Sequence, residues 1–367
     1  MDIALQRLRR QKTAPAVQKN KYKWEKLMKA FLMHIKAFGG FWMTLSIAVS
    51  AMSLAAETAR AGVSSDKLTL GYTTVGAILT PVWIPGEMGI FQKYGLDVDM
   101  KLITTGPVVV SALIAGEIGI AAASGEPIVS GILGGADLTI MGFGTTTTPV
   151  SLYVIPSITQ VEQLKGATVA VSRLTSSGAY ILKVGLKRAG LEAIKDVTLI
   201  QAGGVPESFA VLQAGKVQGA MLSPPTTYKA EALGFKRIWS GLGVEYPSLV
   251  YAVRKSFLRD SEAVALRFLQ AMAEGVHIFN TNKEEALKVM AKYTKVTDRK
   301  VLENSYADNS GVHSPTLEPT RSGIANILET LAGTAPKAAT AKPEDFIDPR
   351  LVKKLEESGF FKKLASR

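Results

Sequence analysis

The residue types that most often carry enzyme chemistry are scarce in this sequence. Cysteine is absent from all 367 residues, which excludes disulfides, thiolate catalysis and thiolate metal sites. The histidines, His34, His277 and His313, lie far apart and show no metal-ligand spacing. Glu126 and Glu207 follow turns and could act as a general acid or base, but no second group pairs with either. We favour a hydrogen-bonding or helix-capping role for both, and we expect no catalytic residue, metal or cofactor.

Short loops rich in Gly, Ser, Thr and Pro indicate a different chemistry, the binding of a small molecule. Ser176 or Ser177 suits the N-cap of a helix over about 179–189, and a helix N-terminus favours an anion. Arg173 could add charge there, or could simply be solvated. Ordinary turns have the same composition, but six such loops occupy matching positions in two halves of the chain. The candidate ligand-binding residues are Thr73, Thr74, Gly76, Trp83, Gly106, Pro107, Ser124, Gly125, Glu126, Ser172, Ser176, Ser177, Gly178, Gly204, Pro206, Ser223 and Pro224.

Trp83 has two alternative roles. It follows Pro81 near the start of a predicted helix, from where it could cover a ligand. Packing in the core is the alternative role for such a residue.

These loops belong to elements that occur twice, about a hundred residues apart. In 105–127, a turn at Gly106 leads to an apolar run, a glycine stop, a short buried strand and a second turn, and 203–225 repeats this order. Strands Leu68–Gly71 and Thr168–Val171 extend the match upstream. Alternating strands and helices predict parallel sheets that bind ligands at the strands' carboxyl ends. We therefore predict an α/β fold of two similar lobes, with mostly parallel sheets and a cleft between the lobes.

The run from Gly71 to Val98 resembles the opening of solute-binding proteins of the nitrate/sulfonate/taurine type, which serve ABC importers. That family also includes the thiamine-pyrimidine-binding proteins. Stretches 115–127, 164–172, 212–222 and 346–361 fit its later landmarks, so the resemblance covers roughly residues 67–364. One departure is that Gly119 and Gln218 stand where the family often has an acidic residue.

The resemblance implies a periplasmic binding protein fold of type II and a function in transport. Such a protein closes its lobes around a small anionic solute, here a sulfonate, a carboxylate or nitrate, and delivers it to the membrane permease of an ABC importer. It is expected to be a monomer without enzymatic activity, with hinges near Val150–Pro156 and Gly243–Ser248. Two alternatives are an enzyme on the same fold, similar to menaquinone-pathway dehydratases or thiamine-pathway pyrimidine synthases, and a membrane-tethered sensor module. The pyrimidine synthases use His- and Cys-rich sites, which this sequence lacks.

Residues 1–61 have the pattern of a signal peptide with a basic extension. Ten Lys and Arg residues in 1–36 precede an apolar segment, Ala37–Ala56, and a small-x-small cleavage pattern ends at Ala61. The apolar segment could also span a bilayer of ordinary thickness, so an uncleaved membrane anchor is the alternative. The extension is long, and a later methionine would give a leader of more ordinary length. Cleavage would leave the protein in the periplasm.

The charge of the chain is concentrated in this leader. The formal net charge is +12, but residues 1–61 hold eleven of the 43 Lys and Arg residues and three of the 31 Asp and Glu residues. The remainder is therefore only mildly basic, and it shows no basic stripe interleaved with aromatic residues. We expect no nucleic acid partner.

The rest of the chain divides into lobes and a C-terminal part. Residues 66–152 and 245–331 are predicted to form lobe one, and residues 153–244 to form lobe two. Helices are predicted over Ser256–Tyr293 and Leu317–Leu331. The segment 332–343 is of low complexity and predicts a mobile loop. Residues 344–367 are expected to form a helix that packs back on the lobes.

Overall fold

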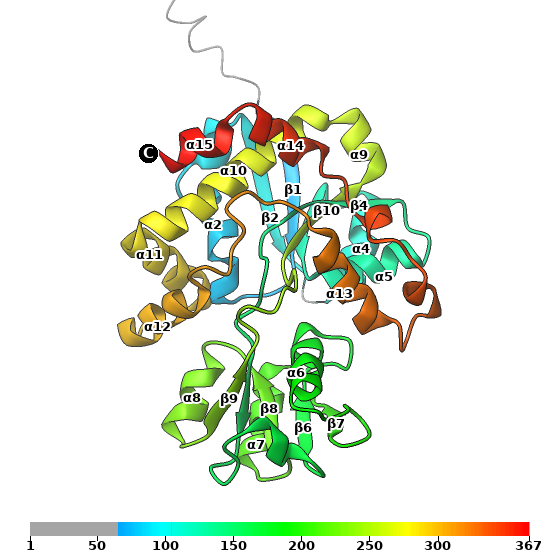
Figure 1. Cartoon of the computed structure of the whole chain (residues 1–367). Helices are drawn as coiled ribbons and strands as arrows, with labels where there is room; N and C mark the ends of the chain where they lie inside the picture. The colour runs from blue at the N-terminus through cyan, green and yellow to red at the C-terminus, as the bar shows by residue number, and fades with distance from the viewer. Residues whose placement is uncertain (1–64, 104, 367) are drawn as a thin grey trace, which may run out of the picture. The chain divides into compact units, whose positions relative to one another are not determined.

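Two five-stranded sheets form the framework of the protein, one in each lobe (Figure 1). The computed structural model describes residues 65–103 and 105–366. The predicted signal peptide, residues 1–61, lies outside the described residues. Within the part that is described, no helix is both long enough and apolar enough to cross a membrane.

The sheet of lobe one is mixed, with four strands running in one direction and one in the other. Its strands lie in the order β2 (Leu96–Leu102), β1 (Asp66–Tyr72), β3 (Ile120–Ala123), β10 (Val250–Arg254) and β4 (Leu138–Phe143). β1 pairs in parallel with β2 and β3, whereas β10 runs antiparallel to both of its neighbours. Both faces of the sheet are covered: Ile120 packs with one set of helices and Ala121 with the other.

The sheet of lobe two repeats this topology. Its order is β7 (Thr198–Gln201), β6 (Thr168–Val171), β8 (Gly219–Leu222), β5 (Ser151–Val154) and β9 (Lys236–Ser240). β6 is parallel to β7 and β8, and β5 is antiparallel to β8 and β9. In each sheet the reversed strand is the first one formed after the chain arrives from the other lobe. The predicted fold class, two similar lobes with mostly parallel sheets, is confirmed.

The chain crosses between the lobes twice, through residues 144–150 and 241–249. The first crossing lies earlier than the predicted hinge Val150–Pro156, because Ser151–Val154 is already a strand of the second sheet. The sheet of lobe two therefore starts two residues before the boundary that the sequence suggested. The second crossing includes the predicted Gly243–Ser248.

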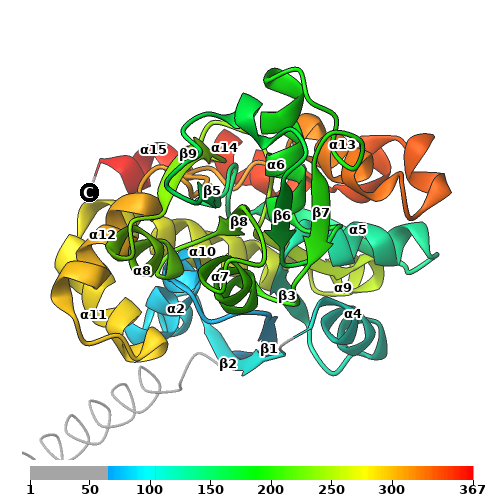
Figure 2. The ribbon, with the colours of Figure 1, turned by 90° about the horizontal axis from the view of Figure 1, so that it is seen from below.

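Helices cover both faces of the sheet of lobe one. Figure 2 shows α4 and α5 on one side of it, with α2 and α10 toward the other. The helices are η2 (Ala77–Leu79), α2 (Thr80–Glu87), α3 (Ile90–Lys93), α4 (Gly106–Ala115), α5 (Gly125–Leu133), α9 (Lys255–Asp260), α10 (Glu262–Thr281), α11 (Lys283–Thr294), α12 (Arg299–Asn309) and α13 (Arg321–Leu331).

Lobe two and the C-terminal part carry the remaining helices. In lobe two these are η3 (Val161–Leu164), α6 (Ser177–Arg188), α7 (Val205–Gln213) and α8 (Thr226–Ala232). The C-terminal part contains η4 (Pro336–Ala339), η5 (Pro343–Phe346), α14 (Arg350–Glu357) and α15 (Phe360–Ala365). Leu351, Leu355 and Leu364 join the core of lobe one.

Capping residues divide several segments more finely than the apolar pattern predicts. The predicted helix Ser256–Tyr293 is three helices, because Ser261 leaves helical geometry and the Asn282 side chain caps α11 by accepting from the N–H of Glu285. The predicted C-terminal helix is divided as well: within 344–366, α14 and α15 are two short helices separated at Gly359, which is in the left-handed region. The predicted loop 332–343 carries the turn η4, in which Ala338 is buried.

We expect Gly275→Ala to destabilise the protein by about 1–3 kcal/mol, because α10 crosses α2 at this glycine. A Cβ there would overlap the carbonyl oxygen of Pro81 and press against the ring of Pro85. The matched control is Gly333→Ala, where a Cβ meets nothing within 4 Å. Urea unfolding measures both variants, and equal stability of the two would contradict this account of the helix crossing.

Candidate functional site

The carboxyl ends of strands from both lobes meet at a pocket of about 500 Å³, here called the helix-end pocket. The N-termini of α4, α5 and α6 open onto it, together with the loop after β1. Nine of the predicted site residues line it: Thr73, Thr74, Gly106, Pro107, Ser124, Glu126, Ser172, Ser176 and Ser177. The structure adds Pro127, Ser130, Arg173, Thr175, Gly203, Leu331 and Thr334.

A second pocket of about 430 Å³ continues from the first along the crossing segments, and we call it the hinge pocket. Thr74 lines both pockets, so they share a wall. The predicted residues Gly76, Pro206, Ser223 and Pro224 lie here. The other lining residues are Val75, Ala77, Ile78, Thr148, Pro149, Val150, Val205, Pro225, Thr226, Ser248 and Asn309.

Four predicted site residues line neither pocket. Trp83 is fully buried in the core of lobe one, where its ring stacks on Tyr293 at a centroid distance of 4.5 Å. Gly125, Gly178 and Gly204 lie at helix starts next to lining residues. Trp83 occupies an apolar position of the predicted helix, and such a position faces the core as readily as a ligand, so the sequence did not distinguish the two roles.

The helix ends give the helix-end pocket a positive field. At α6 the Ser176 hydroxyl accepts from the N–H of Ala179 at 3.3 Å, as the sequence predicts for an N-cap. α4 and α5 have no side-chain cap on their first turns. The dipoles of three helices therefore point toward one space, the first turns of α4 and α5 lack a side-chain N-cap, and Arg173 adds a full charge at the edge of the pocket.

Glu126 is the one carboxylate in this field. It is buried, and Tyr246 donates to its Oε1 at 2.9 Å while Ser124 donates to Oε2. The backbone N–H of Ser177, at the N-terminus of α6 in lobe two, faces this carboxylate of lobe one and lowers its pKa. Burial raises the pKa of Glu126 to about 7, although these hydrogen bonds and Arg173 oppose the rise. The group thus changes charge close to neutral pH.

A second polar contact joins the lobes outside both pockets. The hydroxyl of Tyr228, on α8 of lobe two, donates to Asp308 Oδ2 at 2.5 Å, and Asp308 lies near the end of α12 in lobe one. Burial, followed by Asp308, raises the pKa of the Tyr228 phenol, so the tyrosine is the donor at physiological pH. We call this pair the Tyr228–Asp308 clasp.

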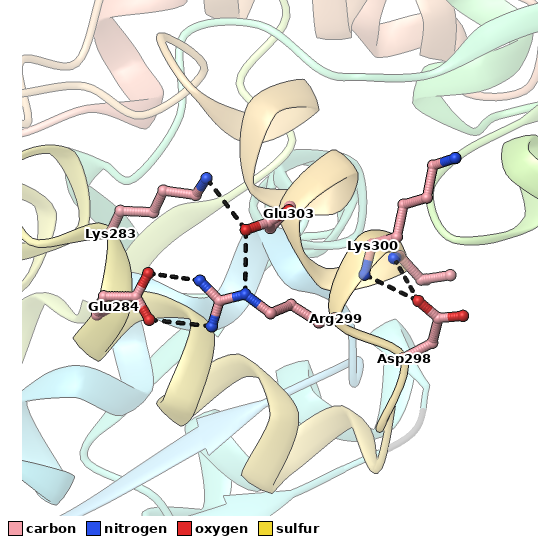
Figure 3. Close-up of polar contacts among 7 residues, drawn as sticks. Lys283, Glu284, Asp298, Arg299, Lys300 and Glu303 are labelled. Carbon is pink, nitrogen blue, oxygen red and sulfur yellow. Dashed lines mark hydrogen bonds and ion pairs between the residues drawn. The ribbon is translucent and has the colours of Figure 1, made fainter.

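An ion-pair network lies at the start of α12 (Figure 3). Arg299 forms two hydrogen bonds with the Glu284 carboxylate of α11, at 2.7 and 3.1 Å, and a third with Glu303. Asp298 caps α12 by accepting from the N–H groups of Lys300 and Val301. Exposed ion pairs stabilise little individually, and the forked Arg299–Glu284 pair contributes mainly a defined contact between α11 and the start of α12.

Several residues of the site were not found by sequence reasoning. Leu331 and Thr334 come from α13 and the turn after it, far in sequence from the loops that they join. Tyr246, Tyr228 and Asp308 act through side chains whose partners lie in other elements, and no local motif marks them. α12 itself was missed, because its polar sequence lacks a clear apolar stripe.

The described residues contain no group of three or more His, Cys, Asp or Glu side chains that could hold a metal ion. His313 is buried, its Nε2 lies 2.9 Å from the carbonyl oxygen of Ile78, and burial lowers its pKa to about 4. Its ring is therefore neutral and structural.

The architecture of these lobes is the fold of periplasmic solute-binding proteins. The periplasmic aliphatic sulphonate binding protein SsuA of Escherichia coli matches with a TM-score of 0.65 at 20% identity, over 78% of this chain and 97% of that one. The periplasmic nitrate-binding protein NrtA of Synechocystis PCC 6803 matches with a TM-score of 0.63 at 13% identity, over 80% and 89%. The desulfurization enzyme DszB matches at 0.57 and 15%, over 79% and 99%, so the fold also supports an enzyme.

Residues 61–294, more than half of the sequence, match the model of the NMT1-like family, and the chain belongs to that family. A Brucella abortus (strain 2308) protein named as a binding protein is 26% identical over 277 residues, which cover 73% of this chain and 83% of that protein. The resemblance to binding proteins of the nitrate/sulfonate/taurine type is confirmed in family and fold.

We expect Glu126→Gln to flatten the pH dependence of stability between about pH 4.5 and 7. In this window the native carboxyl keeps its proton while the unfolded chain has lost it. The native state then binds more protons, so the free energy of unfolding falls as the pH rises. The penalty is absent below the window and complete above it, on the order of 3 kcal/mol.

Urea unfolding across this pH range measures the effect, with Glu207→Gln as the matched control, since Glu207 is exposed and lines neither pocket. Curves of wild type and Glu126→Gln that stay parallel from acid to neutral pH would show that Glu126 has an ordinary pKa.

Proposed function

We propose that this protein captures a small organic anion between its two lobes and delivers it to the permease of an ABC importer. One observation carries the proposal: the N-termini of three helices, from both lobes, surround the helix-end pocket with Arg173 at its edge. Free N–H groups at helix ends bind sulfonate, carboxylate or nitrate groups. Because donors come from both lobes, an anion contacts all of them only when the lobes are closed.

The affinity of the pocket for an anion should depend on whether the Glu126 carboxyl is protonated. Its carboxylate shares the Ser177 N–H with any anion that reaches the N-terminus of α6. When Glu126 is protonated, the pocket gains a neutral partner for the anion, and the repulsion between like charges disappears. Anion affinity is therefore expected to decrease as the pH rises above about 7.

Export to the periplasm is the second part of the proposal. The basic and apolar pattern of residues 1–61 supports a signal peptide, and the fold is that of proteins described as periplasmic. The absence of cysteine from the sequence suits a large core that needs no disulfide.

Binding without turnover is favoured over an enzyme on this fold by the composition of the pockets. Their lining residues include neither His nor Lys, and the sequence contains no Cys. Glu126 is the one lining group with a pKa suited to acid–base chemistry, and general acid–base catalysis needs a substrate proton within its reach. Tyr246 and Ser124, which donate hydrogen bonds to its two oxygens, hold the carboxyl in place, as expected for a positioning role.

We expect Ser177→Asp to weaken the binding of anionic probes by about 1–3 kcal/mol without unfolding the protein. The new carboxylate would repel the anion and occupy N–H groups at the start of α6. Calorimetry with acetate, nitrate and methanesulfonate, and with methylammonium as the cationic comparison, measures the effect. Ser256→Asp, in the first turn of α9 and outside both pockets, is the control. Tighter binding of methylammonium than of any anion would overturn the proposal.

A further expectation is that the Tyr228–Asp308 clasp favours the closed form. Tyr228→Phe removes the interlobe hydrogen bond but touches neither pocket, so it should increase the radius of gyration in small-angle scattering and weaken anion binding several-fold. Tyr153→Phe is a matched control, because Tyr153 donates to Glu231 at 2.6 Å within lobe two alone. Identical scattering and affinity of the two variants would exclude a role of the clasp in closure.

A further inference from the structure

The hinge pocket has a chemistry of its own that limits which anion can be the ligand. It begins at Thr74, the residue that it shares with the helix-end pocket, and adds about 430 Å³ to the cleft. Pockets of this size hold organic molecules, and an inorganic anion in the helix-end pocket would leave the hinge pocket unused.

No charged side chain lines the hinge pocket. Apolar groups form most of its wall, among them Val75, Ile78, Val150 and the prolines that start α7 and precede α8. This contrasts with the helix-end pocket, which contains Glu126 and Arg173. A charged group placed in the hinge pocket would lose its hydration without gaining an ionic partner.

Asn309 adds one specific polar group to this wall. The residue is 1% exposed, and its Nδ2 donates to the carbonyl oxygen of Ser305 at 2.8 Å. That bond fixes the orientation of the amide and leaves Oδ1 without a hydrogen-bond partner among the described residues. A buried acceptor of this kind is normally satisfied, so the wall offers a place for a donor.

We propose that the ligand is an organic anion with an uncharged, largely apolar tail that carries an N–H or O–H donor, and that the tail occupies the hinge pocket with its donor toward Asn309. This inference rests on the proposed function, because the anionic head is assigned to the helix-end pocket. It excludes nitrate and other small inorganic anions as the physiological ligand. The tail would contact residues of both lobes and both crossing segments, since Ile78, Val205, Val150 and Ser248 all line this pocket.

A series of four probes separates head from tail: acetate, hexanoate, 6-hydroxyhexanoate and adipate, measured by calorimetry at about pH 6. Hexanoate should bind at least about tenfold more tightly than acetate, because its methylene groups leave water. 6-Hydroxyhexanoate should gain about a further fivefold through the hydrogen bond. Adipate should bind more weakly than hexanoate, because its second carboxylate has no partner in the hinge pocket.

Gly76→Leu tests the location of the tail. Gly76 lines the hinge pocket with an extended backbone, and a Cβ there meets nothing within 4 Å, so a larger side chain fits without strain. The variant should reduce hexanoate affinity to the level of acetate and leave acetate binding unchanged. Gly333→Leu, which also adds a side chain in open space but lines neither pocket, should bind every probe as wild type does.

Asn309→Leu tests the acceptor, and should remove the preference for 6-hydroxyhexanoate over hexanoate while retaining the preference for hexanoate over acetate. If acetate binds but hexanoate binds no better, or if Gly76→Leu leaves the series unchanged, the tail assignment is overturned and the proposed function stands. If none of the four probes binds the wild-type protein, the proposed function fails and this inference fails with it.

Discussion

The two crossing segments are the constraint on which the remaining structure depends. Each one runs directly into an interior strand of the sheet that it enters, β5 or β10. The two segments are also hydrogen-bonded to each other. The Thr147 hydroxyl donates to the carbonyl oxygen of Gly241 at 2.8 Å, and the N–H of Gly241 donates to the carbonyl oxygen of Val150. Because both ends of each crossing segment are held in a sheet, any bending between the lobes is confined to the few residues of these segments. The lobes can therefore move as units, and the loops at the strand ends keep their arrangement within each lobe.

Glu126 shows how the cleft balances the charge that its helix ends create. A concentration of helix N-termini from both lobes would leave several N–H groups without partners when the lobes meet. The Glu126 carboxyl faces one of them across the interface, at Ser177, and is held in place by Tyr246 from the second crossing. Because an anionic ligand would use the same N–H groups, the ligand and Glu126 compete electrostatically. The raised pKa reduces this competition, since the proton removes the charge near neutral pH.

The sequence predicted the framework of the protein because the framework is repeated. The order of turn, apolar run, glycine stop, strand and turn in 105–127 recurs in 203–225, which indicates two copies of a unit, and a strand such as Thr168–Val171 is marked by its own apolar run. The loops at the strand ends then followed from topology, which is why most of the predicted binding residues line one of the two pockets. Trp83 did not follow, because an aromatic residue on an amphipathic helix has the same pattern whether it faces a ligand or the core.

The sequence could not predict contacts between elements that are distant in the chain. One example is the hydrogen bond that Tyr246, in the second crossing segment, donates to Glu126. Nothing in the residues next to it specifies Glu126, which lies 120 positions away. The same limit applies to the end of α13, whose Leu331 reaches the cleft only because the helix packs against α5. Such contacts depend on the angle at which helices pack, and this angle is set by many small side-chain volumes rather than by a motif.

α12 connects the wall of the hinge pocket with the Tyr228–Asp308 clasp. Its buried side is small, and it contacts neighbouring helices through Arg299 and through Tyr306, which packs on Phe279 at a centroid distance of 4.9 Å. At its end, Asp308 holds lobe two through Tyr228, and the adjacent Asn309 lines the hinge pocket. A tail in that pocket would therefore order the same helix end that holds the clasp. Contacts between the tail and this helix end would favour the closed form, because Asp308 must be ordered before it can accept the hydrogen bond from Tyr228 of lobe two.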